Sequence, residues 1–426
     1  MSQLSEILAE LHARDGSDLV LKHGRPPLMR LSGQLLPSEF PVQDDASIKA
    51  NLDPILKDYH RERLETEREI DLSFEIEGMA RFRVNVFHQR GHVGTVIRLI
   101  PLTTPTIDEM GLPSVLKDVA VSPNGIVLVT GPTGSGKSTT LAAVVQHINQ
   151  TRHAHVITIE DPVEFVYTDD KSTITQRGIG EDTLNAGRAL RAALRQNPDV
   201  ILAGEMRDRE TMELALHAAE TGHLVLSTLH TNDAKQSVTR ITDAFPPENK
   251  QGLLRMLSNS LRAVISQRLL RKADGSGRVA AHEIMIVSPT IEAMIEKGDI
   301  DGMARAIASS SSYYRMQSFN QSLAELVAKR QITEKTALSA SNEPGDLKLL
   351  LKGLSRSGGQ VGGSSVVEEA EPAEKAPPRP SRRIMGRGSR PPQRPPSAGG
   401  GGRPAPPEGG ERPARKPKIN RGFDFT

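Results

Sequence analysis

Apolar and polar positions follow two different rhythms along this chain. Leu4 to His12 places its apolar residues at helical spacing, whereas Ala80 to Phe87 alternates apolar and polar positions. Alternation with a period of two marks a strand with one buried face. Further short strands are predicted over 18–21, 28–31, 71–76 and 94–100, and a polar helix over 48–69. Residues 1–102 are therefore expected to form a small α/β domain.

From about residue 110, continuous apolar runs replace this alternation. They cover 125–130, 155–159, 199–203 and 223–229, with segments of helical spacing between them. A strand that is apolar at every position is buried on both faces, as in a parallel sheet covered by helices. A mostly helical stretch is expected over 284–351. The sequence thus predicts the α/β fold class, with a second domain over 110–354.

The composition changes at Ser355, after which Gly, Pro, Ser and Arg predominate. Such a segment buries too little apolar surface to offset its ordering entropy, so 355–426 is predicted to be a disordered tail. From Lys375 onward it carries 13 of the chain's 54 Lys and Arg but 3 of its 52 Asp and Glu, which leaves a mildly acidic body. That body gives no indication of specific nucleic-acid binding. The basic tail is either a solvated extension or an attachment to an anionic membrane or an acidic partner.

A phosphate-binding motif follows the first apolar run. Gly131 to Ser138 fit the pattern G-x-x-x-x-G-K-[ST], between a predicted strand and a predicted helix. Glycines let backbone N–H groups turn toward a phosphate, and Lys137 would reach the β- and γ-phosphates of ATP while Ser138 binds Mg²⁺. The expected phosphate-binding residues are Gly131, Pro132, Thr133, Gly134, Ser135, Gly136, Lys137, Ser138 and Thr139. The chain is therefore predicted to bind a nucleoside triphosphate.

Two later strands end in carboxylates. The run over 199–205 ends in Glu205, as a Walker B strand does, so Glu205 is expected to hold Mg²⁺ through water. The run over 156–165 ends in Glu160, Asp161 and Glu164. ATP hydrolysis requires a carboxylate that orients or deprotonates the attacking water, and open α/β sheets bind ligands at the carboxyl ends of their strands.

The last apolar run lies between His223 and His230. Ser227, Thr228 and Thr231 gather with His230 near its end, a position suited to sensing the γ-phosphate. Metal binding by the two histidines is the weaker alternative, because no third ligand has suitable spacing.

Composition excludes several kinds of chemistry and compartment. The chain has no cysteine, which excludes disulfides, cysteine-bound zinc, iron–sulfur clusters and thiol catalysis. Its first residues show no signal-peptide pattern, and no run approaches the roughly 18 apolar residues of a membrane span. A cytoplasmic protein is expected.

Taken together, these motifs resemble the secretion-superfamily ATPases, specifically the type IV pilus retraction ATPases of the PilT family. Residues 158–165 resemble the family's Asp box, 201–208 its Walker B segment and 222–231 its His box. The likeness extends over roughly 1–340 and implies a RecA-like P-loop NTPase core behind a small PAS-like domain. It also implies that Glu164 is the catalytic glutamate, Glu205 the Walker B acid, and His223 and His230 the paired His-box residues.

The resemblance further implies an ATP-hydrolysing hexamer at the cytoplasmic face of the inner membrane. Its partners would be the platform protein of the pilus machinery and, indirectly, the pilin. The small domain would pack against the next subunit's nucleotide, so its arginines Arg81, Arg83 and Arg98 are candidates to act in trans on the transferred phosphate. A nucleic-acid or DNA-uptake motor on the same core is the alternative, and a regulatory nucleotide binder is a third reading, which the presence of Glu164 and Glu205 disfavours.

One segment departs from the family pattern. The retraction signature Ala-Ile-Arg-Asn-Leu-Ile-Arg maps onto residues 290–296, where Glu292 and Glu296 replace its two arginines. This charge reversal bears on the direction of the motor and not on nucleotide hydrolysis.

Overall fold

The computed structural model describes residues 3–31, 33–100, 102–310 and 313–356. The predicted disordered tail, apart from its first two residues, lies outside this range. Those two residues belong to the last helix, α14 (Pro344–Arg356). No helix within the described ranges combines the length and the apolar character needed to cross a bilayer.

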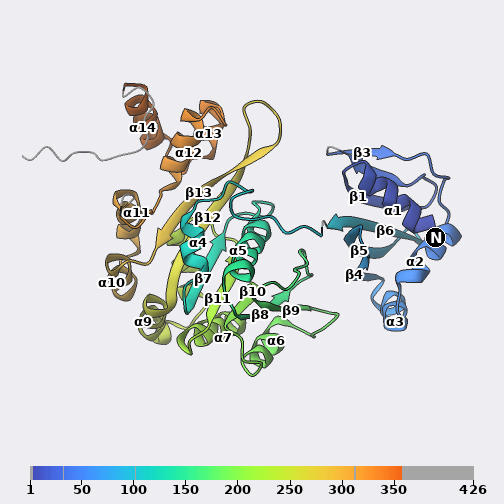
Figure 1. The fold of residues 1–426 in the computed structure, drawn as a ribbon, viewed down its shortest axis with the longest axis horizontal. Helices are drawn as coiled ribbons and strands as arrows, with labels where there is room; N and C mark the ends of the chain where they lie inside the picture. Colours follow the sequence, from blue (N-terminus) through green and yellow to red (C-terminus); the bar gives the residue numbers. More distant parts are fainter. Residues whose placement is uncertain (1–2, 32, 101, 311–312, 357–426) are drawn as a thin grey trace, which may run out of the picture. The chain divides into compact units, whose positions relative to one another are not determined.

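The N-terminal part holds a six-stranded antiparallel sheet in the order β3-β2-β1-β6-β5-β4 (Figure 1). Its strands are β1 (Gly16–Lys22), β2 (Leu28–Leu31), β3 (Gln34–Pro37), β4 (Glu69–Ile76), β5 (Ala80–Gln89) and β6 (His92–Ile100). Its helices are α1 (Gln3–Ala13), α2 (Asp45–Leu52), a 3₁₀ turn (Asp53–Ile55) and α3 (Asp58–Glu67). The alternation along β5 buries Phe82 and Val84 against the leucines and isoleucine of α1, as the period of two predicts.

Two details of this part differ from the sequence prediction. The single helix expected over 48–69 is divided into α2 and α3, because Pro54 lies in the 3₁₀ turn between them and lacks the N–H that a continuous helix needs. Strand β3 was not predicted. All four of its residues are exposed, so it lacks an alternating apolar pattern.

The second sheet has seven strands in the order β13-β12-β7-β11-β10-β8-β9, and helices cover both of its faces (Figure 1). Its strands are β7 (Gly125–Thr130), β8 (His155–Glu160), β9 (Thr173–Gly178), β10 (Val200–Glu205), β11 (Leu224–Leu229), β12 (Leu261–Arg271) and β13 (Arg278–Ile286). The helices before β12 are α4 (Val115–Ala120), α5 (Lys137–Thr151), α6 (Ala186–Ala193), α7 (Arg209–Glu220), α8 (Ala234–Asp243) and α9 (Lys250–Ser260), with a 3₁₀ turn at Pro247–Asn249. All strand pairs are parallel except β12–β13, so the predicted α/β class is confirmed.

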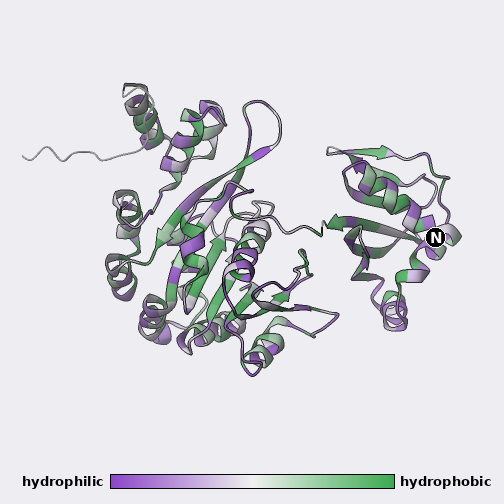
Figure 2. Cartoon of the chain, viewed as in Figure 1, coloured by the Kyte–Doolittle hydropathy of each residue, from purple (hydrophilic) through white to green (hydrophobic). Residues whose placement is uncertain are grey.

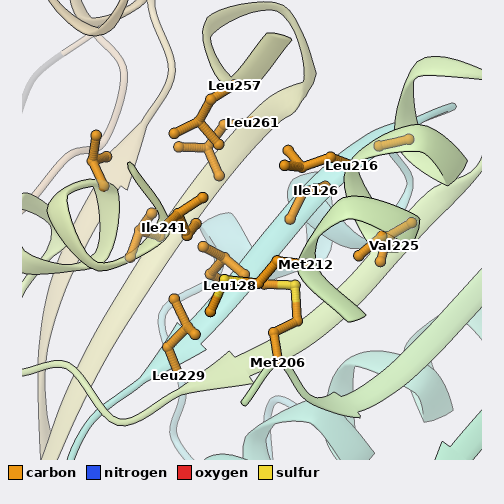
Figure 3. Packing of buried hydrophobic residues seen from close by; sticks show 14 of the residues in the cluster. Ile126, Leu128, Met206, Met212, Leu216, Val225, Leu229, Ile241, Leu257 and Leu261 are labelled. Carbon is orange, nitrogen blue, oxygen red and sulfur yellow. The ribbon is translucent and has the colours of Figure 1, made fainter. Parts of the chain in front are cut away.

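Consecutive residues of β7 face opposite sides of this sheet. Ile126 and Leu128 pack with α6 to α9, whereas Val127 and Val129 pack with α4 and α5. Figure 2 shows the strands of this sheet as predominantly hydrophobic, and Figure 3 shows the cluster on the first side, with Ile126 and Leu128 beside Met212. Burying each such side chain contributes about 1.5–3 kcal/mol. The core therefore fixes the parallel strands, whose carboxyl ends meet at one edge.

The region after β12 is less helical at its start than predicted. Residues 284–286 belong to β13, because they pair with β12 in the register Ala263↔Ile286. The helices that follow are α10 (Pro289–Lys297), α11 (Ile300–Ser309), α12 (Phe319–Ala328), α13 (Glu334–Ala340) and α14.

Candidate functional site

The predicted phosphate loop joins the end of β7 to the start of α5. Gly131, Gly134 and Gly136 adopt φ values of 144°, 76° and 88°, which other residues rarely tolerate. A Cβ at Gly131 would also lie 2.3 Å from the backbone oxygen of Gln267. Within the described ranges, the N–H groups of Thr133, Gly134 and Gly136 donate to no acceptor. The loop thus offers free donors at a helix N-terminus, an arrangement that fits the phosphates of a nucleotide.

Lys137, the first residue of α5, lies over this loop. Its Nζ donates to the backbone oxygens of Gly131 (3.0 Å) and Pro132 (3.2 Å). Burial lowers the pKa of Lys137, while the carboxylates of Glu205 and Glu164 oppose that shift. A phosphate would give Nζ charged acceptors in place of neutral carbonyls, and charge-assisted hydrogen bonds are about twice as strong.

A glutamine on β12 holds the loop from the neighbouring strand. Gln267 is buried, its Nε2 donates to the backbone oxygen of Ser135 (2.6 Å), and its Oε1 accepts the hydroxyl proton of Thr140 (2.8 Å). Gln267 was not among the predicted site residues. Its one sequence signal is an amide that follows the apolar run at the start of β12, and its bonds to the phosphate loop and α5 account for its burial.

Glu205 and His230 meet beside Lys137 at the carboxyl ends of β10 and β11. His230 Nε2 lies 3.0 Å from Glu205 Oε1, and His230 Nδ1 lies 3.5 Å from Lys137 Nζ. Because Lys137 has only protons to offer, Nδ1 accepts and Nε2 donates in this arrangement. Arg207 Nε lies 2.9 Å from the other oxygen of Glu205. The structure therefore brings the predicted Walker B acid and His230 to the phosphate loop.

The three acids after β8 have different surroundings. Glu160 Oε1 accepts hydrogen bonds from the hydroxyl of Thr158 (2.6 Å) and from Gln176 Nε2 (3.2 Å), so it is engaged in holding the strand end. Burial raises its pKa, against the effect of these bonds. Asp161 is exposed and precedes a cis peptide bond to Pro162. The half-buried carboxylate of Glu164 has no hydrogen bond or ion pair within the described ranges. It lies close enough to Lys137 to raise the pKa of that lysine. The carboxylate of Asp161 also has no hydrogen bond or ion pair within the described ranges, but of these three acids only Glu164 lies close enough to Lys137 to raise the pKa of that lysine, so Glu164 remains the candidate for the acid that binds water.

His223 and His230, which the resemblance names as the paired His-box residues, do not contact each other within the chain. His223 precedes β11 and His230 follows it, so they stand at opposite ends of a six-residue strand, about 20 Å apart. His223 Nδ1 is instead 2.8 Å from the backbone oxygen of Ala218, at the end of α7. The two histidines therefore do not bind one metal ion within a chain.

The hydroxyl groups near the end of β11 are also engaged in the fold. Ser227 and Thr228 donate to backbone oxygens of β10, at 2.5 Å and 2.8 Å. Thr231 Oγ1 lies 2.6 Å from Ser237 Oγ on α8. Of the four residues predicted to sense the γ-phosphate, His230 is therefore the one whose side chain faces the phosphate loop.

The candidate trans arginines share one face of the N-terminal sheet. Arg83 on β5 lies opposite Arg98 on β6, and Arg81 is two residues before Arg83 on the same face. Arg81 Nη2 donates to Ser73 Oγ (2.6 Å), and Arg98 Nε lies 2.9 Å from Asp18 Oδ1. The apolar residues between them point into the core of this part, so the arginines occupy its opposite face.

A buried acid behind the site gives a testable pH dependence. Glu283 on β13 accepts the N–H of Ala234 at the start of α8 (2.8 Å), and burial raises the pKa of Glu283 to about 7. The folded chain keeps this proton to a higher pH than the unfolded chain, so the stability from this group falls as pH rises from about 4.5 to 7.

We therefore expect Glu283→Gln to gain stability relative to the natural chain as pH rises from 5 to 8. The amide keeps the bond to Ala234 without the charge, and at about 1.4 kcal/mol per pKa unit the gain is at most about 3 kcal/mol. Burial lowers the pKa of the neighbouring His282 to about 4, which has the opposite pH dependence but is common to both proteins. Thermal unfolding at four pH values measures the difference, and a difference independent of pH would contradict the assignment.

Comparisons with known proteins show the family of this chain. The model of the type II/IV secretion system protein family matches residues 56–344. The chain is 46% identical over 341 residues to the type IV pilus retraction ATPase PilT of Pseudomonas aeruginosa, covering 80% of this chain and 98% of that protein. It is 45% identical over 311 residues to a twitching motility protein of Neisseria gonorrhoeae, covering 73% and 83%. A crystal structure of the pilus retraction motor PilT with bound ADP has a TM-score of 0.76 at 41% identity, covering 82% of this chain and 99% of that one. The chain therefore belongs to the type II/IV secretion system protein family, in the PilT group of its ATPases.

Proposed function

We propose that this chain is an ATP-hydrolysing motor that drives retraction of a type IV pilus. The observation that carries the proposal is that Lys137, Glu205 and His230 meet at the phosphate loop. Glu164 has no hydrogen bond or ion pair of its carboxylate within the described ranges and lies close enough to raise the pKa of Lys137. Two relatives are named for pilus retraction and twitching motility, and this chain covers 98% and 83% of their lengths. This similarity supports pilus retraction as the function of the motor.

Each residue then has a distinct part in hydrolysis. The loop N–H groups and Lys137 would bind the phosphates. The exposed hydroxyl of Ser138 and, through water, Glu205 would hold Mg²⁺, which neutralises charge that develops on the phosphates. Glu164 would orient the attacking water and take its proton. His230 bridges Lys137 and Glu205 and would lose its contact with Lys137 when Nζ turns to a phosphate.

Deleting the gene tests the direction of the motor. Loss of retraction gives cells that carry more pili than normal and do not twitch, and the natural gene restores both properties where a Lys137→Ala gene does not. Cells without pili would show that the motor extends the filament. Normal pili and twitching together with a defect in DNA handling would favour the nucleic-acid motor instead.

The segment that departs from the retraction signature lies on the surface of α10. Glu292 and Glu296 are both exposed and one helical turn apart, whereas Ile291 and Ile295 are buried. The charge reversal therefore changes a surface and leaves the core of α10 intact. The double change Glu292→Arg/Glu296→Arg separates coupling from hydrolysis if it alters twitching at an unchanged ATPase rate.

We further propose that the active form is a homo-hexamer at the cytoplasmic face of the inner membrane, acting on the platform protein and through it on the pilin. Charge on the transferred phosphoryl group commonly needs an added arginine, worth on the order of 10³–10⁵ in rate. The face of β5 and β6 that carries the half-buried Arg81 and Arg83 and the exposed Arg98 is the candidate source of that arginine in trans.

Mixing two inactive chains tests the shared site. We expect Lys137→Ala chains and Arg81→Ala/Arg83→Ala chains to be inactive alone and to recover part of the ATPase activity in mixed rings. Some interfaces then combine an intact phosphate loop with intact arginines. Arg63→Ala, on exposed α3, is the control that should stay active by itself. Mixed rings without recovery, or a fully active monomer, would contradict the proposal.

A further inference from the structure

Two histidines and an aspartate meet at one end of the N-terminal sheet, and none of the three has a part in the hydrolysis proposed above. His23 follows β1, Asp45 is the first residue of α2, and His92 is the first residue of β6. One donor atom from each of these side chains lies within 4.8 Å of the others. Their positions in the sequence are 22 and 47 residues apart, so the fold and not local sequence brings them together.

The backbone fixes these three positions independently of their side chains. β1 pairs with β6 up to Lys22↔Gly94, which places His23 diagonally beside His92. Gly24 N donates to the backbone oxygen of Gln43 (2.8 Å), and Gln43 N donates to the backbone oxygen of Arg25 (2.9 Å). These bonds hold the segment before Asp45 against the turn after His23. The cluster is therefore built on ordered elements, as a preformed site requires.

The donor atoms point toward one another. His92 Nδ1 lies 2.8 Å from Asp45 Oδ2, and His23 Nδ1 lies 3.2 Å from Asp45 Oδ1. The two imidazole rings are stacked, with centroids 3.9 Å apart and planes 11° apart. Within the described residues, the buried Asp45 Oδ1 accepts no hydrogen bond of good geometry and has only the ion-pair contact with His23. A buried carboxylate oxygen without a donor is costly unless a proton or a cation satisfies it.

We propose that His23, Asp45 and His92 form a binding site for a divalent transition metal ion of the zinc class. Two imidazole nitrogens and one carboxylate oxygen suit Zn²⁺, Ni²⁺ or Co²⁺, whereas Mg²⁺ and Ca²⁺ prefer sites made of oxygen alone. Zn²⁺ bonds of about 2.0–2.2 Å place donor atoms roughly 3.4 Å apart, and the oxygens of Asp45 lie 2.8 Å and 3.2 Å from the two imidazole nitrogens, so the stacked rings must turn apart to direct both lone pairs at one ion. The side chains are partly exposed, which leaves the remaining coordination positions to water.

Metal binding at this site requires that each coordinating imidazole nitrogen carries no proton. The ion takes the lone pair of each coordinating nitrogen, so a proton on that nitrogen moves to the other ring nitrogen of a neutral imidazole or passes to solvent from a protonated one. The metal replaces those protons as the link between the turn after β1, the start of α2 and the start of β6. Its expected effect is to stabilise this part of the chain, since binding to the folded state alone raises stability.

The test uses the full chain, freed of metal with a chelator and without nucleotide. Isothermal titration with Zn²⁺ should show one binding event that His92→Ala, His23→Ala and Asp45→Asn each weaken by at least about 100-fold. Loss of an outer-shell partner of a metal ligand already costs 10–100-fold, so loss of a ligand should cost no less. Zn²⁺ should also raise the melting temperature of the natural chain, and Mg²⁺ should not do so through these residues.

The control is His12→Ala, which removes an exposed histidine of α1 outside the cluster and should bind Zn²⁺ as the natural chain does. His23 is exposed beside a turn, so His23→Ala is the variant expected to keep its fold if the others do not. Melting temperatures without metal check this. Equal Zn²⁺ binding by the natural chain and by folded His23→Ala would overturn the proposal, because it would place the ion elsewhere, as at Glu205 and His230. The absence of Zn²⁺ binding would overturn it as well and leave a metal-free ion-pair cluster.

Discussion

Lys137→Ala is expected to lower ATP turnover by at least about 10³-fold while leaving the fold intact. The substitution removes the cation that lies over the phosphate loop, and removing one donor from such a preorganised site commonly costs 10²–10³ in rate. Lys137 is also linked through His230 to Glu205, so its loss disturbs the metal-binding side of the site too. Steady-state ATPase assays at saturating Mg²⁺ and ATP measure the effect.

Stability distinguishes loss of chemistry from loss of structure in that experiment. In the folded chain Lys137 Nζ donates to two backbone oxygens of the loop and lies 3.5 Å from His230 Nδ1, and a hydrogen bond between neutral partners contributes about 1 kcal/mol. The melting temperature should therefore move by a few degrees at most. Lys335→Ala, on exposed α13, is the matched control and should retain full activity. A folded Lys137→Ala protein that turns over ATP would refute the site.

Patterning predicted the parts of the fold whose strands are apolar throughout. β7, β8, β10 and β11 are buried on both faces, so their sequences are continuous apolar runs bounded by turns. β9 was not predicted, because it lies at the edge of the sheet and has no continuous apolar run. Its six residues include Thr173, Gln176 and Arg177. β3 escaped for the same physical reason, since exposed edge strands need no apolar face.

Site residues that belong to a local sequence motif were predictable, whereas residues that reach the site through tertiary pairing were not. The phosphate loop and Glu205 were predictable, because their chemistry is tied to one motif and one strand end. Gln267 was not, because its role depends on β12 lying beside β7, some 130 residues away in sequence. The separation of His223 from His230 follows from the sequence, since a strand predicted between two histidines separates them by its whole length.

Glu164→Gln is expected to leave nucleotide binding nearly unchanged and to cut hydrolysis by about 10²–10⁴-fold. The amide keeps the size and shape of the side chain but is too weak a base to take a proton from water. The backbone N–H of residue 164 bonds Glu160 Oε2 (3.4 Å), and this bond does not depend on the side chain, so the loop should keep its course. Binding is measured with a fluorescent ADP or ATP analogue and hydrolysis by phosphate release.

Two neighbouring acids serve as the comparison for Glu164. Asp161→Asn changes an exposed carboxylate and should leave hydrolysis within a few fold of the natural rate. Glu160→Gln alters an acceptor of Thr158 and Gln176, so it should lower the melting temperature as well as the rate. A rate loss at Glu164 without a loss of stability therefore identifies a residue that acts on the attacking water. Near-normal turnover by Glu164→Gln would transfer that role to Glu205, which already stands beside Lys137 with His230 as its partner.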